Sequence, residues 1–238
     1  MHVALFDPCY QAALRPTDAA HAKRVLEALG DNVTLLDGRC CGQPGYNSGF
    51  RAEAKAVGRG LLKAAQPFPA VVTTSGSCTA MVQHYLPALF PGERGAGAQS
   101  IAARFHAFSA YVAAHPGLPK LALKLPGTVT VHEACHTRRE LGLGGLTAQL
   151  LAQVQGLEVR GLAFEEECCG FGGSFAAKLP EVSVAMMTAK LGDAVATGAR
   201  VIVSEDFSCL AHLEAGARGM GLRLECWTLA ELLSRALG

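Results

Sequence analysis

The sequence lacks an excess of charge of either sign. Its 238 residues include 21 lysines and arginines against 20 aspartates and glutamates, a formal net charge of +1. That balance gives no electrostatic case for nucleic acid or an anionic membrane as the main partner. No apolar stretch reaches the roughly 18 residues that a membrane helix needs, and nothing after Met1 reads as a signal peptide. We therefore expect a cytoplasmic protein with no membrane span and no nucleic-acid partner.

Common catalytic fingerprints are missing as well. The glycine-rich run at 170–173 lacks the strand–G-x-G-x-x-G–helix context of a nucleotide-binding loop. The sequence also contains no G-x-S-x-G nucleophile elbow. The chemistry must therefore be sought in another class of residue.

The sequence is rich in cysteine. Nine cysteines are many for a cytosolic chain, because disulfides are rare in reducing compartments, and the odd count argues against a simple disulfide set. Half of the residues are apolar and 17% are charged, so a packed globular core is expected. Cysteines kept in such a chain indicate metal, cluster or redox chemistry.

The cysteines fall into two matching sets. Each set has one cysteine, then a Cys-Cys pair, then one more cysteine, at similar spacings. Both pairs precede a glycine, Gly42 or Gly170, and both last cysteines follow a serine. The sets are Cys9, Cys40, Cys41 and Cys78, then Cys135, Cys168, Cys169 and Cys209. The chain therefore reads as an internal duplication.

Strands and helices alternate in both halves. Short apolar runs predict strands at 3–6, 33–36, 71–74, 129–132, 159–162 and 201–204, and helical spacing predicts helices at 17–29, 51–65, from Thr79 on, 146–155 and 182–197. This alternation is typical of an α/β fold with mostly parallel sheets. We expect two repeated Rossmann-like halves related by pseudo-two-fold symmetry, with domains at 1–118 and 119–238. The expected linker is 115–119, and 91–97 is an expected surface loop.

The four cysteines of each half are expected to converge. Each cysteine site follows a predicted strand, and the carboxyl ends of parallel strands meet at one edge of a sheet, where ligands bind. Helix N-termini point to the same edge and favour an anionic thiolate group. Gly42 and Gly170 would permit tight turns there and let backbone N–H groups approach sulfur.

Four thiolates suit tetrahedral iron or zinc. Adjacent cysteines are awkward ligands for one zinc ion, whose usual chelate is C-x2-C, whereas neighbouring thiolates can reach different irons of a cluster. We therefore predict an iron–sulfur cluster in at least one half, held by the cysteines of the two sets. Zinc or an empty site in the other half is the alternative. Cys226 lies outside both sets and is expected to be a buried thiol.

Five motifs carry a family resemblance over nearly the whole chain. They are Cys-Cys-Gly-Gln-Pro at 40–44, Ser-Gly-Ser-Cys at 75–78, His-Glu-Ala-Cys-His at 132–136, Glu-Cys-Cys-Gly-Phe-Gly-Gly-Ser-Phe at 167–175 and Asp-Phe-Ser-Cys-Leu at 206–210. The chain resembles the CCG-type cysteine-rich domain of heterodisulfide reductases, and more closely the lactate utilization protein A family. The resemblance implies a cytoplasmic iron–sulfur component of a lactate-oxidising oxidoreductase complex, passing electrons as L-lactate becomes pyruvate. It implies as partners other lactate-utilisation proteins, including a ferredoxin-type iron–sulfur protein.

The sequence departs from that pattern at two positions. Motifs of the heterodisulfide reductase type end in C-x2-C and use five cysteines in each half, whereas Ser75 and Asp206 stand here in place of the fifth. A cubane-type [4Fe–4S] cluster on four thiolates, one or two in each chain, is the simpler expectation, and an oxygen ligand from Ser75 or Asp206 stays open. The alternative functions are cluster-based thiol–disulfide chemistry, which the missing cysteine disfavours, and a zinc-stabilised interaction module.

Two histidines flank Cys135. His132 and His136 have the i, i+4 spacing that can chelate a metal on a helix, but His132 is expected to end a strand. A hydrogen bond near the cysteines, or simple packing, is the other interpretation for both. The sequence shows no independent arginine constellation for binding lactate, so we interpret the chain as an electron carrier whose substrate chemistry sits partly on a partner.

Overall fold

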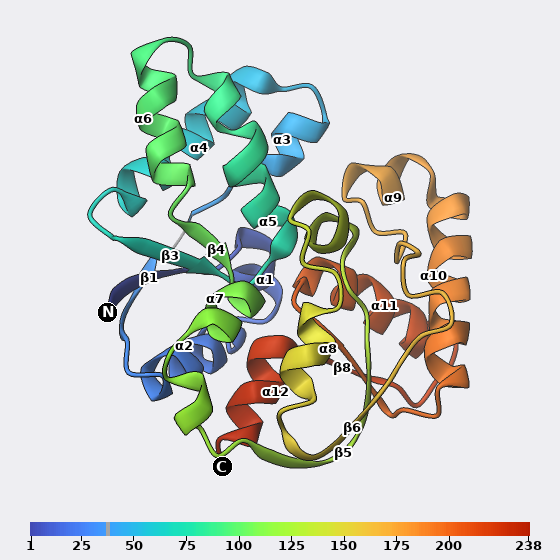
Figure 1. The fold of residues 1–238 in the computed structure, drawn as a ribbon. Coiled ribbons are helices and arrows are strands. Elements are labelled where there is room, and N and C mark those ends of the chain that lie inside the picture. The colour runs from blue at the N-terminus through green and yellow to red at the C-terminus, as the bar shows by residue number, and fades with distance from the viewer. Residues whose placement is uncertain (37–38) are drawn as a thin grey trace. The chain divides into compact units, whose positions relative to one another are not determined.

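The computed structural model describes residues 1–36 and 39–238. They form two compact units, Met1–Leu118 and Pro119–Gly238, each with a four-stranded sheet of its own (Figure 1). All strand pairs described in both sheets are parallel. The predicted α/β class with two Rossmann-like halves is therefore confirmed. Within the described ranges, no helix is long and apolar enough to cross a membrane.

The sheet of the first unit has the strand order β2-β1-β3-β4. Its strands are β1 His2–Phe6, β2 Asn32–Leu36, β3 Ala70–Thr73 and β4 Phe105–Ala107. The two central strands, β1 and β3, are buried over almost their whole length, which explains why they read as continuous apolar runs. They pair in a register that places Phe6 opposite Thr73, so both strands end side by side.

Helices cover both faces of this sheet, as Figure 1 shows. On one face lie α2 Asp18–Ala28 and α7 Phe108–Ala114, and on the other lie α4 Arg51–Ala65, α5 Gly76–Ala80 and α6 Glu93–Ala102. Two short helices, α1 Cys9–Leu14 and α3 Gln43–Asn47, begin at or just after cysteines. The surface loop predicted at 91–97 is wrong in part, because α6 begins at Glu93.

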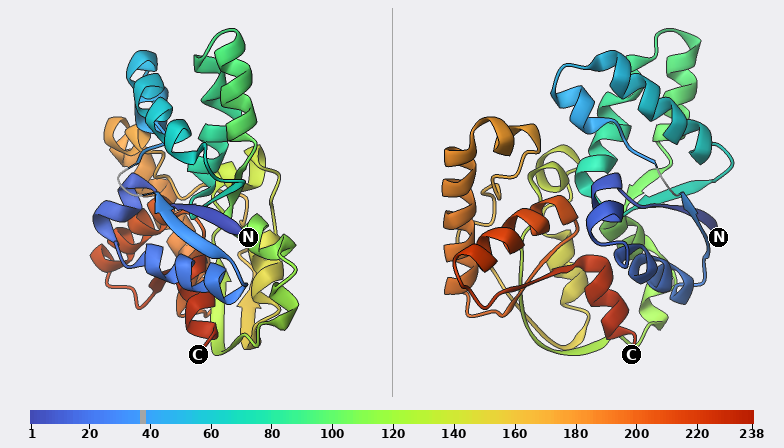
Figure 2. Two further views of the ribbon diagram at one scale, coloured as in Figure 1. Left: turned by 90° about the vertical axis from the view of Figure 1, so that its left-hand side faces the viewer. Right: turned by 180° about the vertical axis from the view of Figure 1, so that it is seen from behind.

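The second unit repeats the arrangement with the strand order β6-β5-β7-β8. Figure 2 shows this unit, coloured from light green through yellow to red, from two further sides. Its strands are β5 Lys124–Val131, β6 Gln155–Arg160, β7 Val201–Ser204 and β8 Glu225–Thr228. Its helices are α8 Leu146–Leu151 and α12 Leu229–Ala236 on one face, α10 Pro180–Ala196 and α11 Phe207–Gly219 on the other, and the short α9 Ser174–Lys178 before α10. In each unit the first strand thus pairs with the second strand on one side and with the third strand on the other.

Two predicted elements of the second unit are wrong in their limits. The helix expected at 146–155 ends at Leu151, and the strand expected at 159–162 begins at Gln155 and ends at Arg160. The strand β6 lies at the edge of the sheet and is partly exposed, so polar residues fill much of it and weaken its apolar signal.

Asp31 joins separate parts of the first unit. Its buried carboxylate accepts hydrogen bonds from the amino group of Met1 at 2.8 Å and from the hydroxyl of Tyr111, on α7, at 2.7 Å. The Nε2 atom of His115 lies 3.4 Å from the same carboxylate. Burial acts to raise the pKa of Asp31, but the hydrogen bonds from Met1 and Tyr111 and the charge of His115 outweigh it and hold that pKa below its usual value.

Replacing Asp31 with asparagine should lower the free energy of unfolding of the first unit by about 1–3 kcal/mol, because hydrogen bonds to a buried charge are weakened. The folded-state pKa lies below the unfolded value of about 3.9, so this stabilisation is present above that value and is lost as pH falls through the folded pKa. Hydrogen exchange of the β1 and β2 amides measures the effect.

The matched control is Glu27→Gln on α2. Glu27 is half-exposed and its carboxylate lies 3.6 Å from the amine of Lys23, so its removal should change the unfolding free energy by no more than about 0.5 kcal/mol. Equal amide protection in Asp31→Asn and the unmodified chain would contradict the role assigned to Asp31.

Candidate functional site

The predicted site cysteines lie after the carboxyl ends of strands in both units. In the first unit Cys9 begins α1 directly after β1, the pair Cys40-Cys41 follows β2, and Cys78 lies in α5 after β3. In the second unit the cysteines follow β5, β6 and β7 in the same order. The convergence expected from a parallel sheet can therefore be tested directly on the distances between sulfur atoms.

The four sulfurs of the first unit form a continuous chain of contacts. The Sγ atoms of Cys9 and Cys40 are 3.3 Å apart, and those of Cys41 and Cys78 are 3.2 Å apart. The adjacent residues Cys40 and Cys41 join the two pairs, and each thiol shifts the pKa of the other. The sequence prediction that these cysteines meet is confirmed, and we call them the first quartet.

The second unit repeats this chain of thiols in the same order. The pKa of each thiol is shifted by its neighbours, Cys168 by Cys135 and Cys169, and Cys169 by Cys209. The Sγ atoms of Cys169 and Cys209 lie within 4.8 Å of one another. We call these four the second quartet. All nine cysteines lie in the described part of the chain and none is in a disulfide. Cys226 is buried in β8, outside both quartets, as predicted.

Each quartet has a buried side and a more accessible side. Cys41 and Cys78 belong to the apolar core of the first unit, and Cys169 and Cys209 belong to that of the second. The remaining four are half-buried, except Cys9, which is exposed. A group held by a quartet would therefore be anchored in the core and reachable from one side.

A glycine after each Cys-Cys pair shapes both sites. Gly42 and Gly170 have φ of +86° and +85°, a conformation that other residues rarely adopt. Their N–H groups donate hydrogen bonds to the Sγ atoms of Cys40 at 3.4 Å and Cys168 at 3.3 Å. A Cβ at Gly170 would lie 2.6 Å from the carbonyl oxygen of Ser183. The expectation that these glycines allow tight turns and amide-to-sulfur contacts is confirmed.

One thiol in each quartet is the shared hydrogen-bond acceptor. The hydrogen bond from Cys41, followed by that from Cys9, lowers the pKa of Cys40. The hydrogen bond from Cys135, followed by that from Cys169, lowers the pKa of Cys168 in the same way. Donation to the acceptor and burial raise the pKa of Cys9 and of Cys135. Four thiolates this close repel one another, so a bound cation would favour ionisation of a whole quartet.

Ser75 and Asp206, which replace the fifth cysteine of the related motifs, both cap helices. The hydroxyl of Ser75 accepts from the backbone N–H of Cys78 at 3.3 Å, at the start of α5. Asp206 accepts from the N–H of Ser208 at 3.2 Å and from its hydroxyl at 2.5 Å, at the start of α11. Each side chain thus fixes the helix that carries the last cysteine of its quartet.

The second quartet has polar neighbours inside the core. His132 is fully buried, and burial together with the charge of Lys190 lowers its pKa to about 4. Lys190, on α10, is also buried and donates to the carbonyl oxygen of Phe164. Sequence reasoning noticed His132 but missed Lys190, whose only signal was a lysine on the apolar face of the predicted helix at 182–197.

His136 lies on the more accessible side of the second quartet. Its Nδ1 is 3.6 Å from the Sγ of Cys135, and its Nε2 is 3.6 Å from the carboxylate of Glu140. Nearby, Arg138 pairs with Glu133 at 3.5 Å. Polar and charged side chains therefore lie beside Cys135 on this side of the second quartet.

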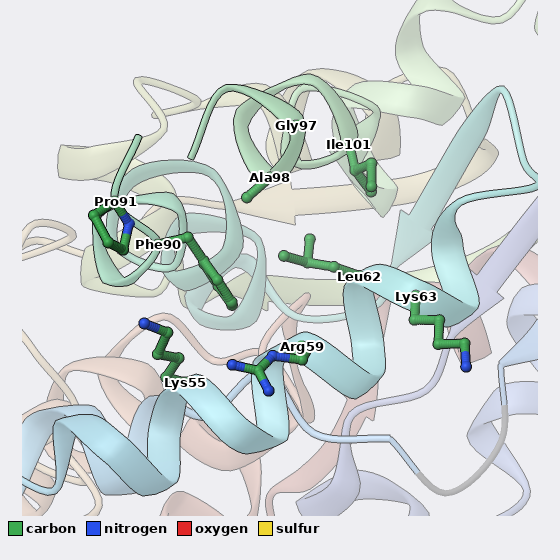
Figure 3. Close-up of a pocket in the computed structure, with 9 residues that line it drawn as sticks. All are labelled: Lys55, Arg59, Leu62, Lys63, Phe90, Pro91, Gly97, Ala98 and Ile101. Carbon is green, nitrogen blue, oxygen red and sulfur yellow. The ribbon is translucent and has the colours of Figure 1, made fainter. Parts of the chain in front are cut away.

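The first unit also contains a basic groove between α4 and α6, with a volume of about 850 Å³. Lys55 and Arg59 reach toward the ring of Phe90, at 5.3 and 6.0 Å from its centroid (Figure 3). The rest of the described lining consists of Leu62, Lys63, Pro91, Gly97, Ala98 and Ile101. This lining contains no cysteine, so the groove is distinct from the first quartet.

Comparison with known proteins matches both units to one family model. Residues 3–83 and 129–214 match the CCG cysteine-rich domain, so each match contains one complete quartet. The crystal structure of a hypothetical protein from Helicobacter pylori is similar in fold, with a TM-score of 0.64 and 10% identity. That similarity covers 100% of this chain and 49% of the Helicobacter chain, so this chain spans about half of its length.

Two curated relatives match the chain from end to end. Lactate utilization protein A of Macrococcus caseolyticus (strain JCSC5402) is 35% identical over 237 residues, covering 98% of this chain and 96% of the relative. Lactate utilization protein A 1 of Bacillus anthracis (strain CDC 684 / NRRL 3495) is 32% identical over 240 residues, covering 100% and 99%.

Replacing Gly170 with alanine should destabilise the second unit by about 2 kcal/mol or more, because strain at positive φ adds to the clash with the Ser183 carbonyl. Trp227, the only tryptophan of the sequence, lies in β8 and reports unfolding of this unit by fluorescence. The control is Gly221→Ala, where φ is +65° but a Cβ meets nothing within 4 Å. Equal losses in the two variants would show that the close approach at Gly170 contributes nothing.

Proposed function

Because this chain belongs to the CCG cysteine-rich domain family, together with lactate utilization protein A, we propose that it is an iron–sulfur protein of L-lactate utilisation. In this proposal it passes electrons while partner proteins oxidise L-lactate to pyruvate. The observation that carries the proposal is the pair of matching cysteine quartets, in each of which cysteines from three separate turns come together.

The eight cysteines of the two quartets are the proposed ligands. The first domain, 1–118, would hold one cluster through Cys9, Cys40, Cys41 and Cys78, and the second, 119–238, would hold another through Cys135, Cys168, Cys169 and Cys209. The donor set fits a cubane-type [4Fe–4S] cluster, because four thiolates are its usual protein ligands. The N–H groups of Gly42 and Gly170 supply hydrogen bonds to thiolate sulfur, which tune a reduction potential.

A bound iron–sulfur cluster takes up and releases single electrons. The residues of this chain hold that group in place and control its access. The buried cysteines of each quartet keep water from one side, while the exposed Cys9 and the half-buried Cys135 leave the other side within reach of a partner. Such partial access suits electron exchange with other lactate-utilisation proteins, including a ferredoxin-type iron–sulfur protein, in the cytoplasm.

A zinc-stabilised interaction module is the second candidate. A single zinc ion with Zn–S bonds of about 2.3 Å spaces its thiolates about 3.8 Å apart. The separations of 3.3 Å between Cys9 and Cys40 and of 3.2 Å between Cys41 and Cys78 lie within about 0.6 Å of that spacing. Thiol–disulfide chemistry has less support, because Ser75 and Asp206 cap helices at the positions of the missing fifth cysteines.

Anaerobically prepared protein should contain iron and acid-labile sulfide in equal amounts, with a broad visible absorption that L-lactate bleaches when the partner proteins are present. Cys41→Ser and Cys169→Ser should each remove about half of the iron, because each variant breaks one quartet. Cys226→Ser is the control and should retain the full amount, since Cys226 lies outside both quartets. Iron, sulfide and zinc analysis of each variant measures the outcome.

Absence of iron and sulfide after anaerobic reconstitution would reject the electron-carrying function. Stoichiometric zinc in active protein would instead support the interaction module. Iron that is retained but never reduced by lactate with its partners would keep the cluster and reject the place in lactate oxidation.

A further inference from the structure

The two units differ at one buried position beside their quartets. In the first sheet Ala4 of β1 pairs with Val71, and in the second Thr130 of β5 pairs with Ile202. Two residues further along each strand are Phe6 and His132. The two side chains therefore occupy equivalent places, at the carboxyl end of the first strand of each unit.

Phe6 suits an apolar setting. It is fully buried in the core that includes Cys41 and Cys78, and its ring lies edge to face against Phe105, with 6.3 Å between ring centroids. Phe6 has no polar atom in its side chain. The first unit thus has a hydrocarbon ring at this place.

His132 is equally buried but cannot be explained by apolar packing. Both of its ring nitrogens are inaccessible to solvent, and neither has a hydrogen-bond partner among the described residues. Leaving a buried polar atom without a partner destabilises the folded state, and buried polar groups of native proteins are almost always satisfied. Apolar packing alone does not explain a core histidine in which both ring nitrogens lack a partner.

The orphaned imidazole lies beside the two buried thiols of the second quartet. A ring nitrogen of His132 and the Sγ atoms of Cys169 and Cys209 all lie within 4.8 Å of one another. An imidazole nitrogen and thiolate sulfurs are the ligands that zinc and iron commonly take in proteins. The group that would satisfy His132 is therefore the same one that would satisfy the cysteines.

A second substitution makes the same part of the core polar. A Cβ atom at Gly42 would face the carbonyl oxygen of Ala54 in α4, and one at Gly170 would face that of Ser183 in α10. Ala54 and Ser183 therefore occupy equivalent places in the two helices. Seven residues further along, this alignment sets Leu61 of the first unit against Lys190 of the second. Both side chains are buried, so the second unit carries a cation where the first carries a hydrocarbon.

We propose that His132 is a nitrogen ligand of the metal held by the second quartet, so that the duplicated chain contains two different sites. The first is a thiolate site bounded by Phe6, and the second is a mixed nitrogen and sulfur site. The inference rests on the proposed function in that it requires the second quartet to bind metal. It applies to an iron of a cluster and to a zinc ion, because both accept this donor set.

The direct test needs no substitution. Protein in which every histidine carries ¹⁵N is reconstituted anaerobically with iron and sulfide, reduced, and studied by electron–nuclear double resonance. A nitrogen bound to iron gives a strong coupling that follows the isotope. In parallel, protein loaded with zinc alone is studied by X-ray absorption, where a nitrogen ligand is distinguished from sulfur by its shorter bond. The two loadings separate a cluster iron from a zinc ion.

Three variants assign the nitrogen. His132→Phe installs the residue of the first unit and should abolish the nitrogen signal and weaken metal retention at the second site by about tenfold or more against a chelator. His132→Cys should restore metal retention without the nitrogen signal, because a thiolate replaces the imidazole. His136→Gln is the matched control beside Cys135 and should keep the nitrogen signal.

Loaded protein without a nitrogen signal overturns this proposal and leaves the proposed function intact. A nitrogen signal that survives in His132→Phe, or that disappears in His136→Gln, overturns it as well, because the ligand would then be another histidine. Failure of the unmodified chain to retain either iron or zinc overturns the proposed function and this proposal together. If His132→Phe does not fold, His132→Cys makes the same assignment, because it removes the same ring nitrogen.

Discussion

The contact between four cysteine sulfurs at the carboxyl ends of parallel strands is the constraint on which each unit depends. Thiols that approach within 3.2–3.3 Å must be presented from three separate turns, and the strand order brings those turns together. The first strand lies between the second and third, so its following turn is next to both of the others. The glycine after each Cys-Cys pair lets the turn that follows the second strand pass against a long helix, at a distance that leaves no room for a side chain.

Much of this arrangement could be predicted from the sequence, because the features that set it are local. The buried central strands are unbroken apolar runs, and the spacing of cysteines repeats. The fourth strands were not predicted: Phe105–Ala107 and Glu225–Thr228 are short and lie at sheet edges, so they depend on pairing with their neighbours more than on their own residues. The roles of Ser75 and Asp206 were equally inaccessible, since a helix cap is recognised only when the helix limits are known.

Duplication has preserved the backbone of the two sites more closely than their surroundings. Both units keep the strand order, the thiol chain and the positive φ of the glycine. The core beside those thiols differs, because a phenylalanine and a leucine of the first unit correspond to a histidine and a lysine of the second. A reduction potential depends on nearby charge and polarity. Groups bound at the two quartets therefore need not have the same reduction potential. Under the proposed function, the two sites would then offer an electron two distinct steps.

The division of each quartet into a core pair and an outer pair has a consequence for damage by oxygen. Oxidants reach accessible thiols first, and reactivity follows thiolate character. In the first unit Cys9 is exposed and Cys40, its contact partner, has the lowered pKa, whereas Cys41 and Cys78 are sealed in the core. Air would therefore oxidise the outer pair of a chain without metal and spare the inner pair. Because the outer sulfurs lie 3.3 Å apart, a sulfenic acid formed by oxidation of Cys40 would condense with the thiol of Cys9 and release water. A mild reductant can reverse the resulting disulfide.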